Sequence, residues 1–189
     1  MTNTSDAQGP WMIFTLTPQV KDATHEHTRY CIDVSHVQQV AEFTFEQLTW
    51  VPLAPPCITG ITNYRGHIIT IIDTATFLGL SCPCPVSGFT IVLRQNDGSP
   101  GNIGLSVDTV VKIVPDDELK TTDVPTEPSI STIVQYADSL IHRIDYDHFL
   151  DHLLKECSTQ ESLNIVDLET GRRQHGTKLK SVLGVHRST

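Results

Sequence analysis

The chain has 189 residues, of which 39% are hydrophobic and 19% are charged, a composition typical of a globular protein with one or two small domains. The 13 Lys and Arg residues against 22 Asp and Glu residues give a formal net charge of −9, which argues against nucleic acid as a partner because phosphate binding requires a basic surface. No apolar run approaches the roughly 18 to 20 residues that cross a bilayer and the polar start does not resemble a signal peptide, so we expect a cytoplasmic protein without direct membrane insertion.

The N-terminal third of the chain contains segments typical of strands. Residues 1–10 are polar, and we expect a disordered terminus there. Residues 11–16 are apolar and rich in aromatic and β-branched side chains, and after a long polar loop residues 29–33 form a second strand. The spacing of apolar residues in 34–40 predicts a helical turn that leads into another strand.

A proline-rich loop at residues 52–56 predicts a short helix at 57–61. The β-branched run at residues 66–73 is typical of a central strand that is buried on both faces. Asp73 is a candidate N-cap for a short helix that ends at Gly79.

The second half of the chain continues with strands. Residues 89–94 and 103–108 flank a cluster of turn-forming residues and therefore predict a hairpin, while the prolines of 115–130 indicate a surface loop. Further strands are expected at 110–114, 130–136 and 139–144, followed by a helix that Asp145 caps and whose apolar positions are Phe149, Leu150, Leu153 and Leu154. The chain shows no strand-helix-strand alternation, so we predict a mostly β fold built as barrels or a sandwich.

An ordered series of motifs resembles a known protein family. The motifs are residues 30–34, residues 37–40, the prolines around Val51, the segment 58–69 that contains Asn63-Tyr64-Arg65-Gly66, and residues 71–73. Together with residues 103–108 and the helix from Asp147 to Leu154, they resemble the CheW coupling proteins of bacterial chemotaxis.

This resemblance implies a fold of two five-stranded SH3-like β-barrel subdomains packed together, with a few short helices and a C-terminal helix. It places the CheW-like domain at residues 11–157, with the first barrel at about 11–66 plus 131–157 and the second at about 67–130. Residues 158–189 lie beyond the resemblance, and we expect a partly disordered C-terminal extension there.

The resemblance also implies a function without catalysis and without a cofactor or metal. Family members are adaptors that couple the cytoplasmic tip of chemoreceptors to the regulatory domain of a CheA-type histidine kinase, and they can self-associate with that domain in rings. The expected location is the cytoplasm, at membrane-associated receptor arrays. The receptor tip, a helical hairpin, is expected in an apolar groove between the barrels.

The matched positions that we assign to this receptor-binding groove or its support are Val37, Val40, Asn63, Arg65, Gly66 and Val107. Arg65 either contacts the receptor or acts as an internal strut, for which the partner is Gln39 where the family commonly has a glutamate. Gly66 is expected to provide a backbone angle or a close approach that a Cβ would forbid. Cys31, Gln39, Tyr64 and a long loop at residues 18–28 depart from the family pattern, so partner specificity can differ.

Two alternatives remain open. The same fold can serve as the adaptor of a pilus-motility pathway or of another chemosensory pathway. A remote alternative is a metal-binding protein that uses His148 and His152, which lie four residues apart on the expected helix. The motifs His25-Glu26-His27 and Cys82-Pro83-Cys84 carry equally little weight as metal sites.

The cysteines and the charge distribution complete the pattern. Five cysteines at irregular spacing are expected as reduced thiols, with Cys31 and Cys57 as small buried hydrophobic residues. From Ser158 onward five basic residues face three acidic ones, so this extension carries +2 while residues 1–157 carry −11. A basic extension of this kind can contact acidic protein surfaces or an anionic membrane.

Overall fold

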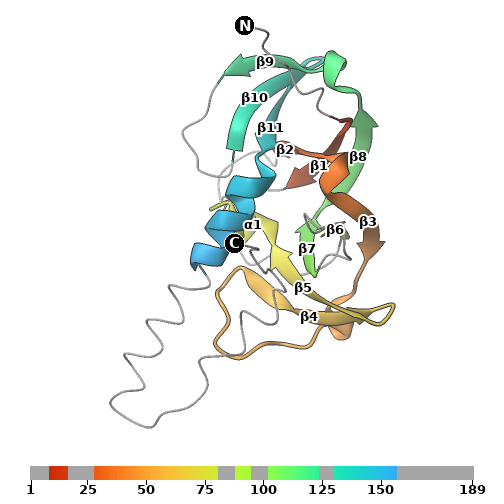
Figure 1. Cartoon of the computed structure of the whole chain (residues 1–189), viewed down its shortest axis with the longest axis vertical. Coiled ribbons are helices and arrows are strands. Elements are labelled where there is room, and N and C mark those ends of the chain that lie inside the picture. The colour runs from red at the N-terminus through yellow and green to blue at the C-terminus, as the bar shows by residue number, and fades with distance from the viewer. Residues whose placement is uncertain (1–8, 17–27, 81–87, 95–101, 124–129, 157–189) are drawn as a thin grey trace, which may run out of the picture.

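A computed structural model describes residues 9–16, 28–80, 88–94, 102–123 and 130–156 of the chain. Within these ranges the fold is mostly β, with two sheets and few helices, as the sequence predicts (Figure 1). The predicted disordered terminus, the long loop after residue 16 and the C-terminal extension lie largely or wholly outside the described residues.

The first sheet has six strands in the order β8-β1-β2-β11-β10-β9. Strands β1 and β2 pair antiparallel, and β11 joins β2 in parallel. The bounds are β1 Trp11–Leu16, β2 Thr28–Asp33, β8 Thr109–Val114, β9 Lys120–Asp123, β10 Ile130–Tyr136 and β11 Ser139–Ile144.

The second sheet has five strands in the order β3-β6-β7-β5-β4. Strand β5 lies inside this sheet between β7 and β4, and its residues are buried from Ile69 onward, which agrees with its predicted central position. The bounds are β3 Val37–Glu42, β4 Ile58–Tyr64, β5 His67–Asp73, β6 Phe89–Leu93 and β7 Ile103–Val107.

Each sheet encloses a small core, and a third core joins the two sheets. All six side chains of β1 are buried because odd-numbered residues such as Ile13 pack inside the first sheet, whereas even-numbered residues such as Phe14 pack in the joint core. Ile91 and Leu105 of the second sheet contribute to the joint core. Ile69, Ile71 and Val92 belong to the separate core of the second sheet. The two subdomains therefore form one packed body.

Short helices are capped as the sequence predicts. Asp73 caps α1 (Thr74–Phe77) by accepting a hydrogen bond from the Thr76 backbone N–H at 3.0 Å. Asp145 accepts one from the His148 N–H at 3.0 Å at the start of the helix at residues 146–156. Figure 1 shows this blue helix running from the first sheet toward the second. Its residues Phe149 and Leu153 are buried in the joint core.

The short helix predicted at residues 57–61 is wrong, because strand β4 begins at Ile58. The side chains from Ile58 to Thr62 alternate between buried and half-buried positions, as expected for β-branched residues on a pleated strand. Gly60 allows this strand to approach the loop before it, since a Cβ there would lie 2.8 Å from the Thr49 carbonyl oxygen. The predicted surface loop at 115–130 also contains the short edge strand β9.

The division between the two subdomains differs from the expected one. Strands β3 and β4, which we assigned to the first barrel, pair within the second sheet. Strands β8 and β9, assigned to the second barrel, extend the first sheet, which therefore has six strands instead of five. The chain changes sheets at the 3-10 turn η1 (Val34–His36), and hydrophobic periodicity does not reveal which distant strand each segment pairs with.

Candidate functional site

Three of the predicted groove residues share one face of the second sheet. Val40 lies opposite Ile91 of β6, and residues directly opposite in a ladder point to the same face. Ile91 belongs to the joint core, as do Val37 and Val107. Val37 and Val107 are buried and so support this face from within, whereas the Val40 side chain remains 37% exposed at the edge strand.

The other three predicted residues lie at the β4-β5 hairpin. Arg65 and Gly66 both have positive φ angles, 52° and 87°, which is the geometry of a two-residue type I′ turn. The Asn63 side-chain oxygen accepts a hydrogen bond from the Gly66 N–H at 3.0 Å and fixes the turn. Gly66 therefore provides the backbone angle that was one of the two predicted roles, whereas a close approach is absent because a Cβ there would meet no atom within 4 Å.

Arg65 is exposed at this hairpin tip. Its guanidinium carbon lies 5.0 Å from the Tyr64 ring centroid, and Tyr64 packs edge-on against Phe43 at 5.2 Å. Among the described residues no hydrogen bond joins Arg65 to Gln39, which is half-buried on β3 at the other edge of the sheet. The predicted Arg65–Gln39 strut is therefore absent from the described residues, and the Arg65 guanidinium is exposed.

An exposed isoleucine that the sequence pattern does not predict lies on the same face. Ile68 lies opposite Asn63 in the β4-β5 ladder and is 47% exposed. Two-residue alternation along β5 places it on the face of Ile72, which belongs to the joint core. We call Val40, Asn63, Arg65 and Ile68 the second-sheet surface. The exposure of Ile68 could not be predicted from sequence, because an uninterrupted apolar strand does not indicate which of its ends is exposed to solvent.

A second exposed apolar site lies on the first sheet. Val111 and Ile113 alternate on β8 and are 46% and 53% exposed. Strand β8 is an edge strand in the described topology, and edge strands are ready sites for protein contacts. We call these two residues the β8 pair. They were missed because their sequence was interpreted only as a strand.

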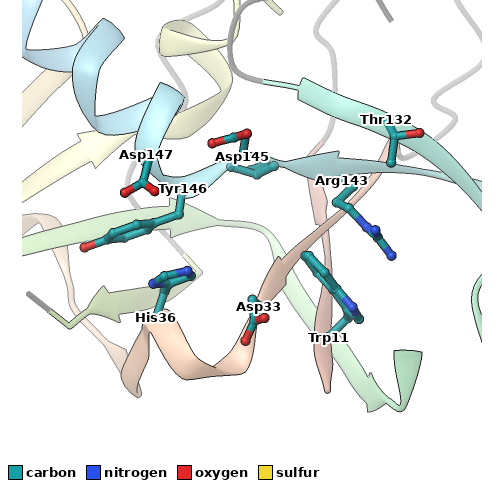
Figure 2. Close-up of a pocket in the computed structure, with 9 residues that line it drawn as sticks. Trp11, Asp33, His36, Thr132, Arg143, Asp145, Tyr146 and Asp147 are labelled. Atoms are coloured by element: carbon teal, nitrogen blue, oxygen red, sulfur yellow. The ribbon is translucent and has the colours of Figure 1, made fainter. Parts of the chain in front are cut away.

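A pocket of about 370 Å³ opens between β1, η1, β11 and the start of the helix at residues 146–156. Figure 2 shows the His36 and Tyr146 rings face to face on one side of it and the Arg143 side chain against Trp11 on the other. The first pair stacks at 3.9 Å between ring centroids, and in the second the guanidinium carbon lies 4.1 Å from the indole centroid.

Hydrogen bonds fix these pocket walls. Asp116 accepts from both the Trp11 indole N–H at 2.7 Å and the Arg143 guanidinium at 3.0 Å. The Tyr146 hydroxyl donates to the Arg94 carbonyl oxygen at 2.5 Å, and thereby connects the helix to the end of β6 in the second sheet. Burial raises the pKa of this hydroxyl to about 12, so it remains a donor at neutral pH.

The two cysteines among the described residues, Cys31 and Cys57, are buried thiols that form no disulfide bond, as predicted. Burial raises the pKa of the Cys31 thiol to about 12, although Arg143 acts in the opposite direction. A thiol with this pKa is neutral at physiological pH and is a poor nucleophile. Cys31 therefore acts as a core residue of the first sheet.

The metal-binding alternative finds no support in the described part of the chain. His148 contacts Asp145 through Nδ1 at 3.0 Å, whereas His152 packs on the Phe77 ring and lies 3.7 Å from Glu156. No group of three or more His, Cys, Asp or Glu residues with metal-binding geometry occurs within the described ranges. The motifs at residues 25–27 and 82–84 lie outside them. None of the described helices has the length and hydropathy of a membrane span.

Comparison with known proteins agrees with this architecture. The structure is similar to that of the scaffolding protein TtCheW from Thermoanaerobacter tengcongensis, with a TM-score of 0.55 and 22% identity over 73% of this chain and 89% of the other. This likeness concerns the fold alone.

Curated relatives match part of the chain. A probable chemotaxis protein CheW of Rhizobium etli is 29% identical over 85 residues, and the chemotaxis protein CheW of Rhizobium meliloti is 26% identical over 103 residues. These matches cover 45% and 54% of this chain and span 52% and 62% of the two relatives. The profile of the CheW-like domain matches residues 23–154. Because this match covers more than half of the sequence, the chain belongs to the CheW-like domain family.

Proposed function

We propose that this protein is a non-catalytic adaptor that couples chemoreceptors to a CheA-type histidine kinase in bacterial chemosensory signalling. The observation that carries the proposal is the presence of exposed apolar side chains on both sheets of a single packed body, with Val40 and Ile68 on one sheet and the β8 pair on the other. An adaptor must hold two partners at once, and rigid attachment of both sites to shared cores fixes the geometry between the partners.

The second-sheet surface is the proposed receptor site. A helical hairpin bound in a groove gains affinity from apolar burial and register from polar groups at the rim. Val40 and Ile68 provide exposed apolar area, while Asn63 and Arg65 provide polar groups at the hairpin tip. Val37, Val107 and Gly66 support this surface through the core and the turn, and Gln39 lies beside it on β3.

The β8 pair is the proposed site for the regulatory domain of the kinase, with which the protein can also assemble in rings. Val111 and Ile113 lie in the other sheet from the receptor site, so both partners can bind together. Binding of these partners would hold the adaptor in the cytoplasm at membrane-associated receptor arrays.

A pull-down with the purified full chain tests both assignments. Val40→Asp should reduce retention of a receptor cytoplasmic fragment about tenfold, and Ile113→Asp should reduce retention of the kinase by a similar factor, since a buried charge at a hot spot costs about 1.4 kcal/mol or more. Val40 is preferable to Val37 here because Val37 is buried and its replacement would disturb the core.

The matched control is Thr122→Asp, an exposed position on β9 at the opposite edge of the first sheet from β8. This variant should retain both partners. Circular dichroism must show the same secondary structure in all three variants. Retention of both partners by the two site variants would contradict the assigned surfaces, and failure of the unchanged protein to retain any kinase would contradict the adaptor function.

The pilus-motility alternative differs only in the source of these partners. Tyr64 and Gln39 replace residues that are common in the family, and Tyr64 lies directly under the exposed Arg65 at the receptor site. Parallel pull-downs with receptors and kinases of a flagellar and a pilus pathway distinguish the two. Stronger retention of the pilus components would assign the protein to that pathway.

A further inference from the structure

We propose that the pocket beside Trp11 is a docking site for the chain's own basic segment, residues 171–189. This binding is intramolecular and electrostatic, and it is independent of the receptor and kinase sites. The occupant is a cationic peptide whose Lys and Arg side chains pair with pocket carboxylates.

The charge of the pocket favours a cation. Three carboxylates line it, those of Asp33, Asp145 and Asp147, against the single guanidinium of Arg143. That guanidinium forms an ion pair at 3.0 Å with a fourth carboxylate, Asp116, so carboxylates outnumber it around the pocket. Among the described residues, Asp33 and Asp147 form no ion pair with a Lys or Arg side chain. A cationic side chain in the pocket would therefore meet uncompensated negative charge.

The shape of the pocket suits a side chain with an apolar stem. At about 370 Å³ it is at the small end of the range for ligand pockets, roughly 300–1,000 Å³. Its walls are the stacked His36 and Tyr146 rings and the Trp11 indole, whose positions hydrogen bonds fix. Aliphatic stems of Lys and Arg pack on such surfaces while the charged ends reach carboxylates.

The sequence provides a tethered occupant of matching charge. Residues 171–189 contain no Asp or Glu, and their basic residues are Arg172, Arg173, Lys178, Lys180 and Arg187. The helix at residues 146–156 begins at the pocket and is roughly 16 Å long. A linker of roughly 16 residues, the number between this helix and Arg172, has a reach of about 20 Å for a random coil and at most about 50 Å, which is long enough for the basic segment to meet the pocket. Tethering raises its local concentration to the millimolar range, which compensates for the small energy of each exposed ion pair.

Carbodiimide cross-linking of the full chain tests the proposal, because this reagent joins a lysine amine to a carboxylate only when the two are in contact. Peptide mapping by mass spectrometry should find Lys178 or Lys180 joined to Asp33, Asp145 or Asp147. The yield should fall at about 0.5 M salt, since salt screens exposed charges. A mixture of ¹⁵N-labelled and unlabelled protein should give cross-links within single isotopic species.

The double variant that combines Asp33→Asn and Asp147→Asn should lower the yield of cross-links to Asp145 about fivefold. This is the effect expected for the loss of two partly exposed ion pairs. Asn preserves the cap that Asp33 provides to η1. The control pair Glu42→Gln with Glu46→Gln changes two exposed carboxylates near the second sheet and should leave the yield unchanged. Links spread over many surface carboxylates, an equal loss in the control pair, or links between isotopic species would overturn the proposal, the last in favour of docking onto a second copy.

Discussion

The Tyr146 hydroxyl is a single group that connects the two halves of the fold. It donates to the Arg94 carbonyl at the end of β6, and the Arg94 N–H in turn donates to the His36 carbonyl at 2.7 Å. Tyr146→Phe removes the hydroxyl and leaves the Arg94 carbonyl oxygen without this hydrogen bond. We expect this variant to lower the free energy of unfolding by about 1–2 kcal/mol in urea denaturation.

The control for this prediction is Tyr136→Phe. The Tyr136 hydroxyl contacts the exposed Lys112 amine, and exposed polar contacts contribute little, so its loss should change the stability by less than about 0.5 kcal/mol. Equal unfolding free energies for Tyr146→Phe and the unchanged protein would show that the connection between helix and second sheet is not energetically significant.

His148 and Asp145 form a second residue-scale pair with a measurable pH signature. The hydrogen bond that the His148 ring donates to the Asp145 carboxylate raises the pKa of His148 above 6.5. Burial of Asp145 acts to raise its own pKa, but the hydrogen bonds from His148 outweigh this effect and lower the pKa below 3.8. For a histidine with a raised folded pKa, the stabilising contribution is complete below 6.5 and is lost as the pH rises through the folded pKa.

We expect an NMR titration to place the His148 pKa above 6.5, and Asp145→Asn to return it toward that value. Asn retains the helix cap, so the variant separates the charge from the cap. A His148 pKa at or below 6.5 in the unchanged protein would contradict the predicted interaction between His148 and Asp145. A raised pKa that Asp145→Asn does not lower would contradict it as well.

At the scale of elements, the β4-β5 hairpin shows how local backbone geometry positions the proposed receptor site. Gly66 has a φ of +87°, and a Cβ added there would meet no atom within 4 Å. Gly66→Ala therefore introduces backbone strain without a clash, and we expect a loss of about 1–2 kcal/mol in unfolding free energy. Gly66→Asn should lose less than half as much, because Asn tolerates positive φ. Equal losses in the two variants would exclude the turn as the cause.

Several elements could be predicted from sequence because their signals are local. The capping residues Asp73 and Asp145 predicted two helix starts, and the turn-forming cluster between residues 89–94 and 103–108 predicted a hairpin, which forms as the antiparallel pair β6 and β7. The helix expected at residues 57–61 failed because tertiary pairing with β5 outweighed the effect of the preceding prolines. The pocket could not be predicted from the sequence. Its wall contains a hydrogen bond between Trp11 and Asp116, which are 105 positions apart in the chain.

At the scale of the whole molecule, the resemblance predicted two subdomains, but chain order misassigned β3, β4, β8 and β9 between them. Pairing across long separations decides sheet membership, and no local pattern encodes it. The same limit applies to the candidate site. Val37 and Val107 were expected beside Val40, but only the structure separates the two buried supports from the exposed contact.

The proposed adaptor function depends on the packed joint core, because this core fixes the relative positions of the second-sheet surface and the β8 pair. Measurement of kinase phosphotransfer in a mixture of receptor fragment, CheA-type kinase and this protein tests that claim most directly. We expect the protein to stimulate the kinase only when receptor is present, and Val40→Asp and Ile113→Asp each to abolish most of the stimulation. Stimulation that persists in both folded variants, or none with the unchanged protein and its own partners, would contradict the account.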